Sequence, residues 1–261
     1  MPEQVPVAAV DTALMPYAEA LAQRLGLGLL PHAIPDPRRY DGAPVLLVFG
    51  FEGLYLQRTG KKAPGPVMVD WASGKNAHRR RQGGAELVVK AVGSARASRP
   101  LAVVDATAGL GEDSLVLAGH GCQVTMLERS GVMAELLADG MRRAENDPDL
   151  EPVLERMRLL GENAVNWLRD HPESVDVVYL DPMFPERRQS AEVRKEMRLC
   201  RDLVGDDADA GDLLEAALAA ALHRVVVKRP RKAGVLPGPQ PASSVVGRSS
   251  RFDIYSRRAL P

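Results

Sequence analysis

Cysteine is scarce in this sequence of 261 residues, and long apolar runs are absent. The two cysteines, Cys122 and Cys200, are too few for a disulfide framework, and neither belongs to a cluster with metal-ligand spacing, so we expect no metal site. No apolar run approaches the roughly 18 residues that a transmembrane helix needs. The first apolar residues are not preceded by Lys or Arg, unlike those of a secretory signal. We therefore expect a cytoplasmic protein that contacts no membrane.

An excess of charge is also absent, because 34 basic side chains balance 34 acidic ones. The sequence thus lacks the high isoelectric point that is typical of many nucleic-acid-binding proteins. The basic residues are nevertheless unevenly distributed, with seven Arg or Lys and one acid in residues 71–99 and a second basic group at 228–232. This distribution is compatible with a basic face for RNA or DNA, and ordinary solvated surface is the alternative explanation.

The sequence pattern changes near residue 72, and we expect a domain boundary there. Residues 1–72 combine a helical pattern with two apolar runs that are typical of paired strands, so they predict a small N-terminal αβ domain. Residues 73–261 alternate apolar strand-like runs with helical patterns and contain one Pro/Gly/Ser-rich predicted loop. This alternation predicts an α/β fold with a doubly wound, Rossmann-like sheet. The expected strands are 101–106, 122–128, 156–161, 175–181, 223–230 and 251–257, and the expected loop is 234–247.

A glycine turn joins the first of these strands to a helix, in residues 103–113. Gly109 and Gly111 let the backbone turn sharply and approach a ligand closely. A dinucleotide-binding motif would have a third glycine where this sequence has Ser114, and the acidic pair before Ser114 would repel a pyrophosphate. S-adenosylmethionine carries a sulfonium and an ammonium group and no phosphate, so it fits the turn better. A tight turn without a ligand explains the two glycines alone equally well.

Polar side chains follow the next two predicted strands. Glu128 comes nineteen residues after Gly109, and an acid at about this distance accepts hydrogen bonds from the ribose hydroxyls of an adenosine ligand. Asn163 and Ala164 follow the third strand, where a loop would meet the adenine ring. A helix N-cap explains Asn163 equally well. An exposed carboxylate at a strand end is the alternative explanation of Glu128, and we interpret this residue as a cofactor contact.

The fourth predicted strand leads into Asp181, Pro182 and Phe184. This motif suits an exocyclic amino group of a nucleobase, because a carboxylate and a proline carbonyl accept its two hydrogens while an aromatic ring stacks on the base. Asp-Pro is also a common turn, and Phe184 has the alternative explanation of a core residue. We interpret all three residues as catalytic, since two cofactor signals precede them in the same predicted sheet.

Several segments resemble the RsmJ family of bacterial 16S ribosomal RNA guanine-N2 methyltransferases, which are class I S-adenosylmethionine-dependent enzymes. The resemblance is carried by the glycine turn with its flanks and by GCQVTMLER, VVYLDPMFP, RVVVKRP and RFDIY, and it covers most of residues 70–256. It implies S-adenosyl-L-methionine as the cofactor. The pocket residues that it implies are Glu112, Asp113, Glu128, Arg129, Asn163, Ala164 and Asp181, and Asp105, Gly109 and Gly111 complete the predicted cofactor site.

The resemblance also implies a reaction, which is methyl transfer to guanine N2 in small-subunit ribosomal RNA or in an assembly intermediate. Methylation of adenine N6 or of a protein glutamine amide is an alternative, and so is a non-catalytic RNA-binding assembly factor. We expect the two basic groups of the sequence to hold RNA phosphates. The residues concerned are His78, Arg79, Arg80, Arg81, Lys228 and Arg229.

Overall fold

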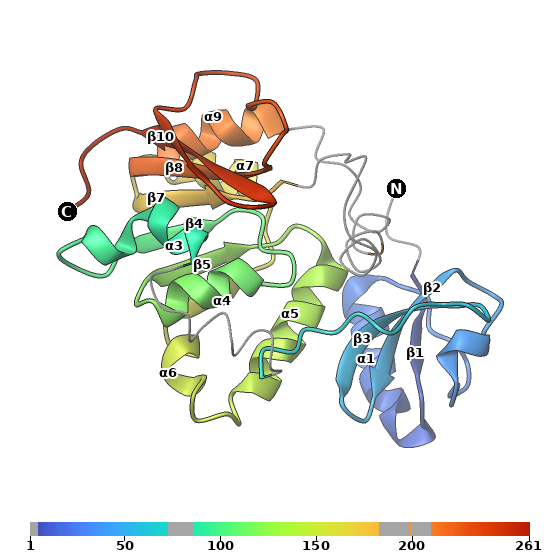
Figure 1. Ribbon diagram of the computed structural model, residues 1–261. Helices are drawn as coiled ribbons and strands as arrows, with labels where there is room; N and C mark the ends of the chain where they lie inside the picture. The colour runs from blue at the N-terminus through green and yellow to red at the C-terminus, as the bar shows by residue number, and fades with distance from the viewer. Residues whose placement is uncertain (1–4, 73–85, 183–198, 200–209) are drawn as a thin grey trace. The chain divides into compact units, whose positions relative to one another are not determined.

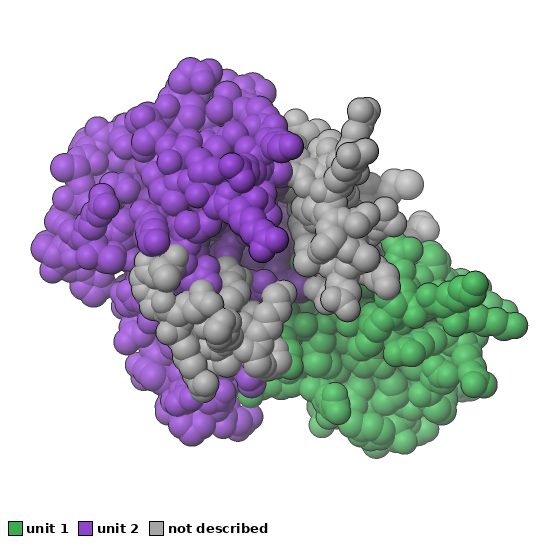
Figure 2. All heavy atoms as spheres, viewed as in Figure 1, with its two compact units in different colours: residues 1–70, 130–143, 185–206 green, residues 71–129, 144–184, 207–261 purple. Residues whose placement is uncertain are grey.

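The computed structural model describes residues 5–72, 86–182, 199 and 210–261 of the chain. The chain divides into two compact units, which Figure 2 colours separately. Among the described residues, the first unit contains those up to Asp70 together with Ser130–Arg143, and the second contains the remainder apart from Leu199. Every described residue of the predicted cofactor and catalytic sites belongs to the second unit.

A three-stranded sheet forms the centre of the first unit (Figure 1). Its middle strand, β2, is parallel to β1 and antiparallel to β3, and β2 and β3 form the hairpin expected from the two apolar runs. Helix α1 buries small and aliphatic side chains and ends at Gly26 in the left-handed conformation, a common helix C-terminus. The elements are β1 (Val7–Ala9), η1 (Thr12–Leu14), α1 (Met15–Leu25), η2 (Pro37–Arg39), β2 (Val45–Gly50) and β3 (Gly53–Arg58).

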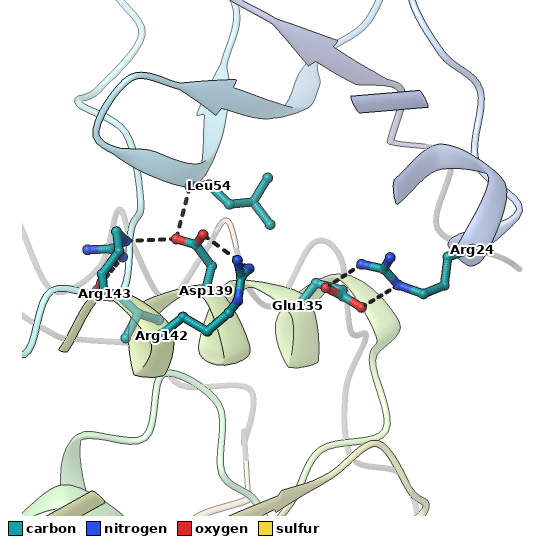
Figure 3. Close-up of polar contacts among 7 residues, drawn as sticks. Arg24, Leu54, Glu135, Asp139, Arg142 and Arg143 are labelled. Atoms are coloured by element: carbon teal, nitrogen blue, oxygen red, sulfur yellow. Dashed lines mark hydrogen bonds and ion pairs between the residues drawn. The ribbon is translucent and has the colours of Figure 1, made fainter. Parts of the chain in front are cut away.

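Helix α5 (Gly131–Ala144) is held within the first unit by polar contacts (Figure 3). Asp139, which is 5% exposed, accepts a hydrogen bond from the backbone N–H of Leu54 at 3.0 Å. Arg24 of α1 donates two hydrogen bonds to Glu135, at 2.9 and 2.8 Å. These pairs are 85 and 111 positions apart in the sequence, so no local pattern predicts that α5 packs with the N-terminal residues.

The second unit is built on a seven-stranded sheet with the strand order β6-β5-β4-β7-β8-β10-β9 (Figure 1). The strands from β6 to β8 in this order are parallel, and β10 is antiparallel to both β8 and β9. Chain order reverses between β4 and β7, and ligands of such sheets bind outside the carboxyl ends of the strands at this point. The strands are β4 (Ala102–Asp105), β5 (Gln123–Leu127), β6 (Met157–Leu160), β7 (Val175–Leu180), β8 (Ala221–Pro230), β9 (Ser243–Val246) and β10 (Ser250–Ser256).

The two faces of this sheet differ in the residues that they carry. Val104, Val178 and Leu180 pack in a core cluster with residues of α7 and α9. Because side chains alternate along a strand, Asp105 and Tyr179 point to the other face, where both contact α4. The polar groups at the carboxyl ends of β4 and β7 therefore gather on the α4 side. The helices of this unit are α3 (Leu87–Val92), η4 (Ser94–Arg96), α4 (Glu112–Gly119), α6 (Glu151–Leu154), α7 (Ala164–Asp170) and α9 (Ala210–Ala220).

The predicted α/β class and Rossmann-like parallel sheet are confirmed, and each of the six predicted strands is present. The prediction of an unbroken loop at 234–247 is wrong, because Ser243–Val246 pair with β10 as an edge strand. Of the described residues, no helix is long and apolar enough to cross a membrane. The boundary at residue 72 stays a prediction, since 73–85 lie outside the described ranges.

Candidate active site at the carboxyl edge of the sheet

The turn between β4 and α4 needs its glycines for backbone conformation. Gly109 and Gly111 have φ angles of 53° and 71°, in the left-handed region that disfavours side chains. A methyl group on Gly109 would meet nothing nearer than the carbonyl oxygen of Thr107, at 3.9 Å. The indole N–H of Trp71 donates to the carbonyl of Leu110 at 3.2 Å and holds the turn from outside. The turn is thus fixed in shape and leaves space beside Gly109.

Asp105 ends β4 and ties the strand to the turn and to α4. Its carboxylate is 2% exposed and accepts hydrogen bonds from the Ser114 hydroxyl at 2.6 Å and the backbone N–H of Thr107 at 3.1 Å. Burial raises the pKa of Asp105 to about 7, with the negative charges of Asp113 and Asp181 adding to the effect and the two hydrogen bonds opposing it. The structure therefore gives Asp105 a supporting role, and its predicted cofactor contact stays a prediction.

Glu128 follows β5 and lies beside the glycine turn. Its Oε2 accepts the backbone N–H of Gly109 at 3.0 Å, and the preceding Leu127 accepts the N–H of Ala108 at 3.2 Å. The residue is only 7% exposed. The structure thus brings together the glycine and the acid that the sequence spacing pairs.

The other predicted cofactor residues lie at the ends of helices or loops. Asn163 caps α7, because its side-chain oxygen accepts the backbone N–H of Asn166 at 3.1 Å, and Ala164 is the first residue of that helix. Glu112 begins α4 and is half-buried, while Arg129 is exposed. The cap reading of Asn163 is therefore confirmed, and cofactor contacts of these four residues stay predictions.

Asp181 stands at the carboxyl end of β7, attached to the glycine turn. Its backbone N–H donates to Thr107 Oγ1 at 2.6 Å, and its side chain is 38% exposed. Pro182 follows and is buried. Phe184 lies outside the described residues, as do His78, Arg79, Arg80 and Arg81. The sequence analysis did not include Thr107 in the predicted site. Its position in the turn, two residues before Gly109, is the signal that could have identified it.

A lysine joins Asp181 to α4, which the sequence analysis did not predict. Lys228 Nζ lies 2.8 Å from Asp181 Oδ2 and 2.7 Å from Asp113 Oδ2, and the Tyr179 hydroxyl donates to the same Asp113 oxygen at 2.7 Å. Burial lowers the pKa of Lys228, but attraction by Asp181 and Asp113 outweighs it and raises that pKa above its ordinary value. The lysine is therefore charged at neutral pH.

Lys228 and Arg229, which the sequence analysis predicts to bind RNA phosphates, both have partners within the protein. Lys228 is engaged by two carboxylates, and Arg229 is 8% exposed and donates two hydrogen bonds to the carbonyl of Gly234, at 3.1 and 2.9 Å. Lys228 is partly exposed and Arg229 is buried, and phosphate binding by these two residues stays a prediction. The sequence did not indicate these partners. Lys228 and Arg229 are consecutive strand residues that point to opposite faces of the sheet, and only the strand register shows which groups each side chain contacts.

Acidic groups predominate where the described strands end. Asp105, Asp113, Glu128 and Asp181 lie at or beside the carboxyl ends of β4, β5 and β7, with Lys228 among them. Such surroundings favour a ligand with positive groups and disfavour a pyrophosphate. The sulfonium and ammonium of S-adenosylmethionine meet this requirement, and the space beside Gly109 allows close approach. The residues present therefore fit this cofactor.

Comparison with known proteins agrees with this chemistry. A family model described as "Putative SAM-dependent methyltransferase" matches residues 38–257. Proteins named ribosomal RNA small subunit methyltransferase J, from Marinobacter nauticus and Pseudomonas aeruginosa, are 52% and 50% identical to this chain. The matches cover 94% and 97% of this chain and 88% and 95% of those proteins. The chain belongs to the methyltransferase J family.

A solved structure supports the enzyme class and the fold. The crystal structure of an S-adenosylmethionine-dependent methyltransferase from Neisseria gonorrhoeae is similar to this chain with a TM-score of 0.71 and 33% sequence identity. The similarity covers 97% of this chain and 96% of that one. The present protein is an S-adenosylmethionine-dependent methyltransferase of the methyltransferase J family. The predicted family, enzyme class and cofactor are therefore confirmed.

Proposed function

We propose that the protein methylates the exocyclic N2 amino group of a guanine in small-subunit ribosomal RNA. The observation that carries this proposal is Asp181, a partly exposed acid whose backbone and carboxylate are both held in place where β7 ends. The names of the methyltransferase J relatives support ribosomal RNA of the small subunit as the substrate. The acid suits a planar amino group because it accepts hydrogen bonds from it.

The residues would divide the work as follows. S-adenosylmethionine supplies a methyl group made electrophilic by its sulfonium. Glu128 holds the ribose hydroxyls at the glycine turn. Asp181 and the Pro182 carbonyl accept the two hydrogens of the guanine amino group, which orients its poorly nucleophilic nitrogen, and Asp181 then takes the proton that is released. The target base must be unpaired or flipped out of its stack to reach this edge.

The product of the reaction tests the proposal. We expect the protein to transfer labelled methyl groups from S-adenosylmethionine to unmodified small-subunit RNA, either free or within the subunit, and to produce N2-methylguanosine after nuclease digestion. Free RNA and assembled subunits are compared in parallel, which identifies the preferred substrate. Label in N6-methyladenosine or in methylated protein glutamine would contradict the proposed specificity, and no transfer to any of these would contradict an active enzyme.

Three exposed basic residues at the same edge of the sheet are better placed than Lys228 and Arg229 to contact RNA. Arg231 and Lys232 follow β8 and are exposed. The backbone N–H of Arg231 donates to the carbonyl of Ser249 at 3.0 Å, which brings the exposed Arg248 to the same end of the strands. β8 is parallel to β7, so this end is the one at which Asp181 stands. We propose Arg231, Lys232 and Arg248 as phosphate contacts.

Changing Arg231 and Lys232 together to Gln should weaken binding of small-subunit RNA. Each lost single-strand phosphate contact should also flatten the log–log salt dependence of affinity by about 0.7. The matched control changes Arg257 and Arg258 to Gln, because these arginines lie beside His223 near the opposite end of β8. Filter binding at several salt concentrations measures both slopes. Equal slopes for the two double variants would show that the Arg231 group is solvated surface.

A further inference from the structure

Lys228 contacts polar groups at the ends of two neighbouring elements, β7 and α4. Its side chain is 29% exposed, and its ammonium contacts one oxygen of Asp181, at the end of β7, and one of Asp113, in α4. Tyr179 binds the same Asp113 oxygen from two residues before Asp181. The lysine therefore links the acid of the proposed target site to a helix that is itself fixed by a buried tyrosine.

The register of the sheet explains why Lys228 meets these groups. Leu180 pairs with Val227 in the parallel ladder, so Asp181 and Lys228 are the next residues along the two strands. Val226 pairs with Tyr179, and residues two apart share a face, so Lys228 and Tyr179 lie on the α4 side. The backbone pairing of β7 and β8 therefore places Lys228 next to Asp181.

The acidic groups around Tyr179 favour a cation at the position of Lys228. Asp105 of β4, Asp113 of α4 and Asp181 beyond β7 all act on Tyr179, whose pKa is raised well above its ordinary value, chiefly by burial and then by these three acids. Lys228 of β8 supplies a positive charge 2.7 Å from Asp113 and 2.8 Å from Asp181. Removing that charge would make protonation of these acids more favourable.

We propose that Lys228 is a positioning residue for methyl transfer, which holds the Asp181 carboxylate ionised and correctly oriented toward the target amino group. This inference rests on the proposed role of Asp181. A buried ion pair is a weak source of stability, because desolvation opposes the Coulomb attraction, so stability alone is a poor reason for placing one at the edge of the site. An oriented acceptor at Asp181, in contrast, is needed by the chemistry.

Lys228→Met, which removes the charge and keeps much of the length, should lower kcat for methyl transfer about 10²-fold with little change in the KM for RNA. The acid limb of the pH–rate profile should move to higher pH by about 1–3 units, because the acid loses its neighbouring cation. Lys228→Arg should restore part of kcat and return the acid limb toward its original position. Circular dichroism and thermal melts show whether each variant is folded.

Three outcomes decide the inference. An unchanged acid limb and kcat in folded Lys228→Met would overturn it in favour of a structural ion pair. A raised KM for RNA with a flatter salt dependence and an unchanged kcat would overturn it in favour of phosphate binding. If Lys228→Met does not fold, Lys228→Arg decides through the same pH profile. A partly lowered kcat with the acid limb near its original position supports a positioning cation, and loss of activity without a profile shift contradicts it. Failure of the wild-type protein to form N2-methylguanosine would instead contradict the proposed function.

Discussion

Asp181→Ala should lower single-turnover methyl transfer at least about 10²-fold, which is the scale of lost orientation or lost proton acceptance. The variant should still fold, because the hydrogen bond from residue 181 to Thr107 uses the backbone N–H and survives the substitution. The deleted carboxylate is 38% exposed, so no sealed cavity is left behind. Asp181→Asn keeps an acceptor oxygen and loses the charge, and we expect it to be more active than Asp181→Ala.

The measurement combines transfer of labelled methyl groups to small-subunit RNA with titration of S-adenosylmethionine. Glu128→Gln is the informative contrast, since it should weaken cofactor affinity by about 1.5–3 kcal/mol through a lost charge-assisted hydrogen bond. Asp170→Ala, an exposed acid at the end of α7, should change neither property. If folded Asp181→Ala transfers methyl groups at nearly the wild-type rate, the target base must be held by another part of the sheet edge.

Local sequence signals were sufficient for six of the seven strands of the sheet and for the acids at three of the strand ends. Strands β4, β5 and β7 are short apolar runs bounded by turns, and an acid at the end of each is visible without a structure. The spacing of Gly109 and Glu128 correctly paired two groups that lie 3.0 Å apart. Family resemblance then identified the cofactor, because its motifs fall on these same strand ends.

Sequence patterns could not predict contacts that depend on strand register or on residues far apart in the chain. Lys228 looked like part of a basic surface, and only its place opposite the end of β7 shows that it faces acids. Helix α5 lies between two predicted strands of the second unit in the sequence, yet its Asp139 and Glu135 contact residues of the first unit. Strand β9 is half polar and lies in a Gly/Pro/Ser-rich segment, so its pairing with β10 left no periodic signal.

Asp105 should make the protein less stable as the pH rises from about 4 to about 7. Its pKa is about 7 in the folded protein and near 3.8 ordinarily, so over this interval the folded state binds more protons than the unfolded state. The free energy of unfolding must then fall with pH, by on the order of 4 kcal/mol for this group, and the loss is complete above the folded pKa. Asp176 affects stability at lower pH, because its hydrogen bonds with Arg99 lower its pKa. The stability that this ion pair contributes is present above the ordinary pKa of an aspartate and is lost as the pH falls through the lowered pKa.

Asp105→Asn should remove this slope and give a protein more stable than wild type at pH 8. The amide can accept the N–H of Thr107 through its oxygen and donate to the Ser114 hydroxyl through its nitrogen, so both contacts of the carboxylate are retained without a buried charge. Denaturant unfolding at pH 5 to pH 8 measures the difference between the two proteins, in which the titration of all other groups largely cancels. Parallel curves would mean that Asp105 does not titrate in this range. A variant that is less stable than wild type at pH 8 would mean that the ionised carboxylate stabilises the folded protein there, which contradicts a raised pKa of Asp105.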